Sequence, residues 1–402
     1  MADWQKLEKK YLMDTFKRLP VTIVKGQGVR AWDENGNEYL DFIGGLAVNV
    51  LGHSHPVVVK AVSKQAREII QTSNLVYSVP QVKLAKLMID NSCMDKVFFC
   101  NSGAEACEGA VKLARRYGMI HRKGAWEVIT ATKSFHGRTL AMTAATGQSK
   151  FQDPYEPLPE GFVNVAYDNI AAIKKATTAK TCAVMMEPIQ GEGGVNVPSD
   201  DYLKKIRAWC DKSGILLILD EIQTGIGRTG TLFAYEQYGV EPDIMTLAKG
   251  LGGGVAIGAF MAKDRVSVFE HGEHGSTFGG NPLACATGYA TLNYILNNGV
   301  VDNCKRVGAY LTKSIDGLKK KSNLVVGVRG RGLLQAMELS REVAADFVLE
   351  CMKEGLLLNA VTPSAVRFMP PLIITEKDVD EAMTIVKRVL PRVEKKKSPS
   401  HT

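Results

Sequence analysis

The chain has 402 residues, of which 45% are hydrophobic and 23% are charged. These are the proportions of an ordinary globular protein, and they exclude a disordered, collagen-like or low-complexity chain. A net charge of +8 is mild for this length, so it permits nucleic acid as a partner but argues equally for small anions such as phosphates and carboxylates. The length suits one large α/β domain or two intertwined domains.

The cysteines and the N-terminus bear on the cellular compartment. The eight cysteines form no C-x-x-C pair and mostly stand among apolar residues, which predicts buried free thiols in a reducing environment. Residues 1–8 contain early acids and no hydrophobic stretch, unlike a secretory signal or a transit peptide. No apolar run approaches the roughly 18 residues that a membrane-spanning helix needs. We therefore expect a soluble cytoplasmic protein.

The first 50 residues predict a short helix and then strands, with a strong hairpin signal at Asn35-Gly36. From about residue 56, predicted helices alternate with short runs that are apolar throughout. Such runs suit strands buried on both faces of a mostly parallel sheet, and hence an α/β fold. The strand candidates are Lys96–Cys100, Glu127–Ala131, Cys182–Met186, Ile215–Leu219, Ile244–Leu247 and Ala256–Met261.

Two serines are candidate helix caps. Ser102 begins a capping-box pattern that ends at Glu105, and Ser199 is placed to cap a helix that ends near Gly214.

After about residue 290 the pattern changes to helices at 291–298 and 301–322, a glycine-rich stretch, a strand, a helix near 341–354 and a last helix from Glu376. We expect a large domain of residues 56–290, and a small α+β domain built from residues 1–55 and 291–402. The lysine-rich end from Lys395 is typical of a frayed tail.

A carboxylate and a lysine follow two of the apolar runs. Asp220 comes directly after one run, and Lys249 follows another and precedes a glycine-rich stretch. The carboxyl ends of parallel strands open into the crevice where α/β proteins bind ligands. Glycines there let the backbone approach a ligand closely. Taken alone, each of the two charged residues would more often be structural.

The stretch Phe98–Glu105 adds a phosphate site to this edge. A strand ends, the chain turns and a helix begins, so Gly103 and Ala104 offer backbone N–H groups at a helix N-terminus. A phosphate site, an acid and a lysine at one sheet edge fit pyridoxal 5'-phosphate, because the lysine can form the Schiff base and the acid can keep the pyridine nitrogen protonated. The sequence has no Walker motif and no well-placed Rossmann fingerprint, which disfavours nucleotides.

Three blocks, Leu219–Gly230, Pro242–Gly254 and His274–Ala284, resemble the class III (ornithine/4-aminobutyrate-type) aminotransferases, and the resemblance covers nearly the whole chain. It implies the fold of aspartate aminotransferase: a mostly parallel seven-stranded sheet with helices on both faces, plus a small α+β domain. Within the class, residues 73–77, 134–138 and 187–195 are most similar to the acetylornithine aminotransferases.

The resemblance implies roles around the cofactor. Lys249 would carry the Schiff base and move the proton between substrate and cofactor carbons, and Asp220 would hold the pyridinium proton. Gln223 would hydrogen-bond the phenolic oxygen, and Phe135 would stack on the ring. Thr277 would bind the phosphate from the other subunit, which implies a homodimer with shared active sites.

The resemblance also implies how substrates are bound. Planar, bidentate arginines suit an enzyme that takes different carboxylates in its two half-reactions. Arg138 resembles the arginine that binds the α-carboxylate of acetylornithine and the distal carboxylate of glutamate. Arg367 resembles the one that binds the α-carboxylate of glutamate. Glu192 resembles its switch partner, which neutralises Arg367 when the donor has no second carboxylate, and Ser276 resembles a donor contact.

The implied reaction moves the side-chain amino group of N2-acetylornithine to 2-oxoglutarate, as in arginine biosynthesis; related enzymes also accept succinyl-diaminopimelate. Three alternatives stay open. The donor could instead be ornithine, 4-aminobutyrate or a diamine. The chain could be an aminomutase on the same fold, although two arginines favour a two-substrate transaminase. It could also be a basic binding protein that uses the lysines at 395–397.

One cysteine and three histidines are the remaining candidates for a role. Cys107 stands where the family usually has asparagine, one turn inside the phosphate-binding helix. His136 is either a neighbour of the cofactor ring or structural, while His53 and His55 read as structural. The cysteine and histidine spacings predict no metal site.

Overall fold

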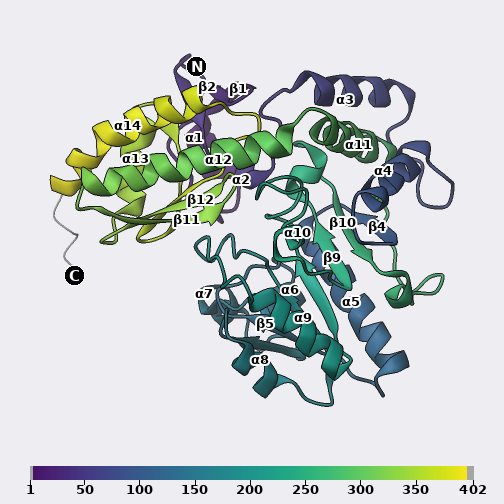
Figure 1. Ribbon diagram of the computed structural model, residues 1–402. Helices are drawn as coiled ribbons and strands as arrows, with labels where there is room; N and C mark the ends of the chain where they lie inside the picture. The colour runs from purple at the N-terminus through teal and green to yellow at the C-terminus, as the bar shows by residue number, and fades with distance from the viewer. Residues whose placement is uncertain (1–2, 396–402) are drawn as a thin grey trace.

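The computed structural model describes residues 3–395, and its centre is a seven-stranded sheet (Figure 1). Its strands, in spatial order, are β4 (Lys96–Cys100), β10 (Gly258–Ala262), β9 (Ile244–Leu247), β8 (Leu216–Asp220), β7 (Thr181–Met186), β5 (Glu127–Ala131) and β6 (Phe162–Val165). The pairs from β9 to β6 are parallel, and β10 is antiparallel to both of its neighbours. The predicted α/β class is therefore confirmed.

The strands are apolar at successive positions because both faces of the sheet are covered by helices. On β8, Leu217 and Leu219 join the core that contains residues of α9 (Tyr202–Ser213). Leu216 and Ile218 point the other way, into the core formed with α5 (Gly103–His121) and α6 (Leu140–Ala145). All six predicted strands are present within two residues at each end. β6 was not predicted, since it is a half-buried edge strand interrupted by Asn164.

The remaining helices are distributed along the whole chain. They are α1 (Trp4–Tyr11), α2 (Gly44–Ala47), α3 (Pro56–Glu68), α4 (Val79–Asp90), α7 (Ser149–Gln152), α8 (Ile170–Ala176), α10 (Tyr235–Tyr238), α11 (Pro282–Asn297), α12 (Val300–Asp316), α13 (Ala344–Lys353) and α14 (Glu376–Lys395). α11 packs against α3 and α4, and α12 packs against α14. α11 spans residue 290, where the sequence pattern changes.

Strands from the N-terminal and C-terminal parts of the chain meet in one sheet. β1 (Ile23–Gln27), β2 (Arg30–Asp33) and β3 (Glu38–Asp41) form antiparallel pairs, and β13 (Leu356–Leu357) pairs in parallel with β3. A further sheet has the order β11 (Val325–Arg331), β12 (Leu334–Leu339), β15 (Ala365–Phe368) and β14 (Asn359–Thr362). In Figure 1 the purple N-terminal strands lie among green and yellow C-terminal elements.

One predicted cap is wrong and another is modified. α9 begins at Tyr202 without a side-chain cap, because the Ser199 hydroxyl donates to Asp168 instead, at 2.6 Å. Ser102 does accept from the Glu105 N–H, but the Glu105 carboxylate accepts from the N–H of Asn101 rather than closing the box on Ser102.

The predictions about thiols, membrane spans and the tail have separate outcomes. All eight cysteines are free thiols, and all but Cys93 are buried, as predicted. Among residues 3–395, no helix has both the length and the apolar character needed to cross a membrane. The predicted tail from residue 396 lies outside the described residues.

Candidate active site

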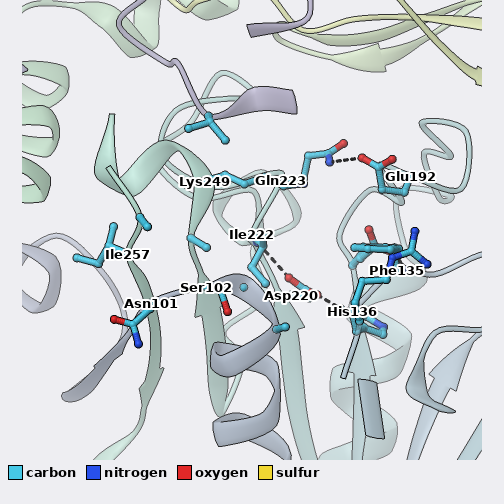
Figure 2. Close-up of a pocket in the computed structure, with 18 of the residues that line it drawn as sticks. Asn101, Ser102, Phe135, His136, Glu192, Asp220, Ile222, Gln223, Lys249 and Ile257 are labelled. Atoms are coloured by element: carbon cyan, nitrogen blue, oxygen red, sulfur yellow. Dashed lines mark hydrogen bonds and ion pairs between the residues drawn. The ribbon is translucent and has the colours of Figure 1, made fainter. Parts of the chain in front are cut away.

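A cavity of about 460 Å³ opens at the carboxyl ends of β7, β8 and β9 (Figure 2). Glu187 directly follows β7, Asp220 ends β8, and Lys249 lies two residues after β9. The cavity is therefore at the sheet edge that the sequence predicted, and its volume suits a small cofactor. The predicted site residues that line it are Gly103, Ala104, Phe135, Arg138, Glu192, Asp220, Gln223 and Lys249.

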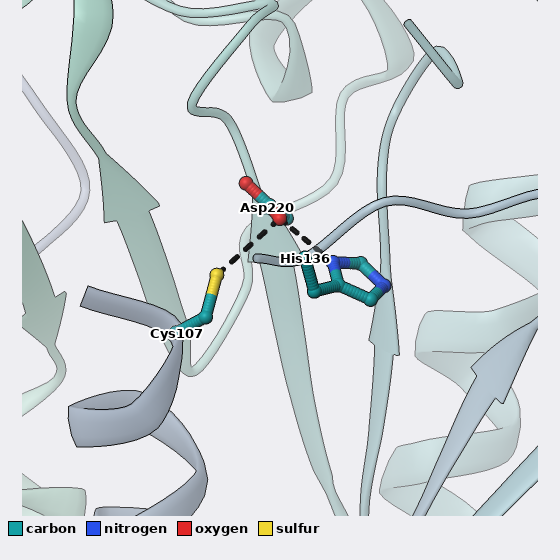
Figure 3. Close-up of side chains that lie close together, drawn as sticks. All are labelled: Cys107, His136 and Asp220. Atoms are coloured by element: carbon teal, nitrogen blue, oxygen red, sulfur yellow. Dashed lines mark hydrogen bonds and ion pairs between the residues drawn. The ribbon is translucent and has the colours of Figure 1, made fainter. Parts of the chain in front are cut away.

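Asp220 is the centre of a buried hydrogen-bond network (Figure 3). Its Oδ2 lies 2.7 Å from His136 Nδ1 and 3.4 Å from Cys107 Sγ, and its Oδ1 accepts from Thr246 and from the N–H of Ile222. Burial would raise the pKa of this carboxyl, but the hydrogen bond and charge of His136 outweigh burial and lower it. Asp220 is consequently held as a carboxylate at the cavity wall.

The same contacts explain two residues that sequence left uncertain. The ligand atoms of Cys107, His136 and Asp220 lie within 4.8 Å of one another, as metal ligands would. Here, however, hydrogen bonds to one Asp220 oxygen account for that closeness. His136 lines the cavity, but its Nδ1 is hydrogen-bonded to Asp220, so its role is to hold that carboxylate in position. Burial raises the pKa of the Cys107 thiol well above its usual value, and Cys107 is therefore a weak neutral donor.

Lys249 has an unusual backbone conformation. Its φ of 41° is in the left-handed region, which costs a non-glycine residue energy and is concentrated at functional sites. Burial lowers the pKa of its amine, with Glu192 opposing the shift. The structure records no hydrogen-bond partner for this amine within residues 3–395. A free amine with a lowered pKa is suited to nucleophilic attack on a carbonyl group.

The N-terminus of α5 borders the same cavity. Ser102 caps the helix by accepting from the N–H of Glu105 at 3.2 Å. The N–H groups of Gly103 and Ala104 have no acceptor among the described residues, and both residues line the cavity. Such unpaired donors at the positive end of a helix dipole form an anion site.

A second network holds Arg367 on β15. Its Nη1 donates to Glu192 at 2.8 Å, to Gln223 Oε1 at 3.1 Å and to the carbonyl of Gly191, while Nη2 donates to Asn359 at 2.8 Å. Arg367 is 1% exposed. Gln223 also donates to Glu192, at 3.0 Å. Although burial opposes it, the charges of Arg367 and Lys249 lower the pKa of Glu192 to about 2, so this pair is ionised.

Arg138 is in a contrasting environment. It is exposed at the cavity, and within residues 3–395 it has neither an ion-pair partner nor a hydrogen-bond acceptor. Its guanidinium carbon lies 5.0 Å from the ring centre of Phe135. Of the two arginines predicted to bind carboxylates, one is therefore neutralised by the protein's own glutamate and the other is free.

Other predicted residues lie outside the cavity of this chain. Ser276 contacts it only indirectly, by accepting from the Asn101 side chain at 3.2 Å. Thr277 is exposed, and its carbonyl accepts from Gln71. His53 bonds Asp41, and His55 accepts from the N–H of Val57 at the start of α3, in line with their structural interpretation.

Glu187 is a cavity residue to which sequence reasoning gave no role. It follows a buried strand in the same way as Asp220, and that position was the available signal. Its carboxylate accepts from the N–H groups of Phe135 and Gly191, which fixes the loops before Arg138 and Glu192. Burial raises its pKa to about 7 although His136 opposes the shift, so Glu187 is partly protonated near neutral pH.

A family model, "Aminotransferase class-III", matches residues 12–390. The chain belongs to the class III aminotransferases. An "Acetylornithine aminotransferase" of Caldanaerobacter subterraneus subsp. tengcongensis is 50% identical over 96% of this chain and 98% of its own length.

Solved structures of aminotransferases superpose closely on this chain. An acetylornithine aminotransferase from Elizabethkingia anophelis has a TM-score of 0.86 at 34% identity, covering 97% of this chain and 98% of that one. An ornithine aminotransferase from Toxoplasma gondii, described with PLP at its active site, has a TM-score of 0.93 at 35% identity, covering 98% of this chain and 94% of that one.

Class III aminotransferases depend on pyridoxal 5'-phosphate, and the residues present fit that cofactor. The unpaired N–H groups at the start of α5 suit its phosphate, the buried Asp220 carboxylate suits its pyridinium, and the free amine of Lys249 suits its aldehyde. All three face one cavity of suitable size. The chain is therefore a pyridoxal-phosphate-dependent aminotransferase.

Proposed function

We propose that this class III aminotransferase transfers the side-chain amino group of N2-acetyl-L-ornithine to 2-oxoglutarate. The products are N-acetyl-L-glutamate 5-semialdehyde and L-glutamate, as in arginine biosynthesis. The relatives named acetylornithine aminotransferase, at up to 50% identity over 96% of the chain, support the substrate. The observation that carries the proposal is the contrast between the free Arg138 and the paired Arg367.

That contrast matches a donor with one carboxylate. Acetylornithine has an α-carboxylate and an acylated, uncharged α-amine. Arg138 takes the carboxylate, while Glu192 keeps Arg367 neutralised beside the reacting amine. Glutamate has a second carboxylate. For glutamate to bind, the Glu192 side chain moves away from Arg367, and the α-carboxylate of glutamate takes the place of Glu192. Asn359 keeps Nη2 of Arg367 in position during this exchange.

Residues of this chain also hold the cofactor and move the proton. The N–H groups of Gly103 and Ala104 would bind the phosphate, and the Asp220 carboxylate would keep a proton on the ring nitrogen. Phe135 would cover the ring, and the amide hydrogen of Gln223 that Glu192 does not use would be available to donate to the phenolic oxygen. The bound cofactor supplies an electron sink for the carbon that loses its proton. The Lys249 amine would be the base that takes this proton from the substrate carbon and returns it to the cofactor carbon.

Replacing Glu192 with alanine is expected to impair the acetylornithine half-reaction more than the glutamate half-reaction. Without Glu192, Arg367 is left as an unpaired buried cation next to a donor that has no carboxylate for it. We expect a selectivity change of roughly 10-fold or more between the two half-reactions, measured by single-turnover kinetics. Glu192→Gln is the control of similar shape, and equal losses in both half-reactions would contradict the switch.

The proposal extends to a second subunit. We propose a homodimer in which Thr277 of one chain binds the phosphate held by the other. Its support is the exposure of Thr277 outside its own chain's cavity and the neighbouring Phe278, which is 63% exposed.

We also propose that residues 1–55 and 291–402 form the small domain, and residues 56–290 the large one. The free thiols agree with a reducing location such as the cytoplasm.

The proposed function is tested by the choice of amine donor. The purified enzyme, loaded with pyridoxal phosphate, is mixed separately with acetylornithine, ornithine, 4-aminobutyrate, succinyl-diaminopimelate and glutamate, and the loss of the cofactor's visible absorption is followed. We expect the fastest reactions with acetylornithine and glutamate. A preference for ornithine or 4-aminobutyrate would overturn the donor assignment. Turnover that needs no 2-oxoglutarate and keeps the amino group on one substrate would indicate an aminomutase.

A further inference from the structure

The free guanidinium of Arg138 is supported by two aromatic rings. Its Cζ lies 3.8 Å from the ring centre of Phe151 and 5.0 Å from that of Phe135. The two rings meet edge to face, with centres 6.1 Å apart at 80°. Phe135 lines the cavity, whereas Phe151, on α7, does not. Phe151 therefore acts on a substrate through the two cavity residues that it contacts, Arg138 and Phe135, and of these only Arg138 carries a charge.

Hydrogen bonds at both ends fix α7 in place. Gln148, just before the helix, donates its amide to the carbonyl of Ser134, which precedes Phe135. Gln152, its last residue, donates to the carbonyl of Ala144 and to Asn164 on β6. The helix that carries Phe151 is thus tied both to the loop that leads from Ser134 to Arg138 and to the central sheet.

This support has a consequence for binding. An exposed arginine loses side-chain entropy when a ligand orders it. Stacking on a ring uses the face of the guanidinium and leaves its N–H edges free for a carboxylate. A ring that orders Arg138 beforehand reduces the entropy lost on binding.

We propose that Phe151 is a positioning residue that presents Arg138 to the substrate carboxylate. The inference rests on the proposed role of Arg138, but not on the identity of the amine donor. Lys150 lies over the same ring, with Nζ 4.6 Å from its centre, and adds a second positive charge at this place. The ligand class for this subsite is a carboxylate carried at the far end of the substrate from the reacting amine.

The test is Phe151→Leu in the cofactor-loaded enzyme. KM for glutamate and for acetylornithine should rise roughly three- to tenfold, while kcat changes less than about twofold, because ordered binding is lost and the chemistry is kept. Phe151→Tyr, which retains a ring face, should restore KM. Calorimetric binding of glutarate, an unreactive dicarboxylate, should weaken by the same factor as KM.

Two matched variants separate this role from a structural one. Phe162→Leu removes another ring that contacts an arginine, Arg115 at 5.1 Å, away from the cavity, and should leave KM unchanged. Lys150→Ala removes the second charge but keeps the ring. If Lys150→Ala reproduces the whole effect, charge and not positioning is responsible, and the proposal fails.

A diamine without a carboxylate, such as 1,4-diaminobutane, gives the deciding comparison, since Phe151→Leu should not change its KM. An equal rise for the diamine, or no rise for glutamate, would overturn the proposal. Glutamate is the common amino-group partner of every donor considered, so this test remains valid if acetylornithine proves to be the wrong donor.

Discussion

Replacing Lys249 with alanine is expected to lower the rate of amino transfer by on the order of 10²- to 10⁴-fold, because the group that carries the proton is removed. The loss should be in kcat, since neither arginine is touched. The variant should still bind the cofactor's phosphate at the start of α5, but its visible absorption should differ from that of the wild type. Absorption spectra and single-turnover rates measure the two effects.

A small amine added to Lys249→Ala is the control for this assignment. Methylamine can enter the space left by the side chain and carry the proton, so it should restore part of the rate in proportion to its concentration. Lys249→Arg keeps the charge but, because a guanidinium stays protonated, should not recover activity. Activity near that of the wild type in the alanine variant would mean that another base moves the proton.

The lowered pKa of Lys249 adds a pH-dependent expectation. Burial makes the amine easier to deprotonate, so it becomes neutral at a pH below the 10.5 of an ordinary lysine. Capture of pyridoxal phosphate by the cofactor-free enzyme should therefore rise with pH and level off below that value. A stopped-flow titration measures the midpoint, and a midpoint at or above 10.5 would contradict the electrostatics described here.

The sequence was most informative where local pattern and topology coincide. The run before Asp220 is apolar at every position, since β8 packs on α5 with one face and on α9 with the other. Parallel neighbours then bring Asp220 and Lys249 to one edge without any further information. Glu187 has the same signal, since it directly follows β7, the parallel neighbour of β8.

The hydrogen-bond network around Arg367 could not be derived from the local sequence pattern. Arg367 comes from β15 and Glu192 from a loop far earlier in the chain, so their contact depends on how the C-terminal sheet sits against the central one. Without the family resemblance, nothing near Arg367 in the sequence predicts its partner. Phe151 is a similar case, since a half-buried phenylalanine in a four-residue helix has no pattern that distinguishes it.

The Ser199 cap failed for a different reason. A serine before a helical run is a good local candidate, but its hydroxyl was taken by Asp168, a tertiary partner. Cys107 is intermediate between these cases. Sequence placed it one turn inside α5, next to the phosphate site, but only the fold brings its thiol to Asp220.

Replacing Asp220 with asparagine is expected to reduce kcat by on the order of 10²- to 10³-fold while the cofactor still binds. The carboxylate accepts hydrogen bonds on both oxygens, from His136 and Cys107 on one side and from Thr246 and the Ile222 N–H on the other. An amide NH2 group placed on one side faces the Thr246 hydroxyl and the Ile222 N–H, and placed on the other side it requires His136 Nδ1 to become an acceptor by a change of tautomer. The substitution also removes the negative charge that keeps a proton on the ring nitrogen, so the electron sink is weakened.

Cys107→Ala is the matched control for Asp220→Asn. It removes one weak donor, 3.4 Å from the same carboxylate, and leaves the charge in place, so kcat should change by less than about threefold. A pH titration of the bound cofactor's absorbance reports the ring proton directly and should shift in Asp220→Asn but hardly in Cys107→Ala. If Asp220→Asn keeps a rate within tenfold of the wild type and its titration is unchanged, the ring nitrogen is not served by Asp220. Glu187, which is buried at the same cavity with a pKa of about 7, would then be the carboxyl to test.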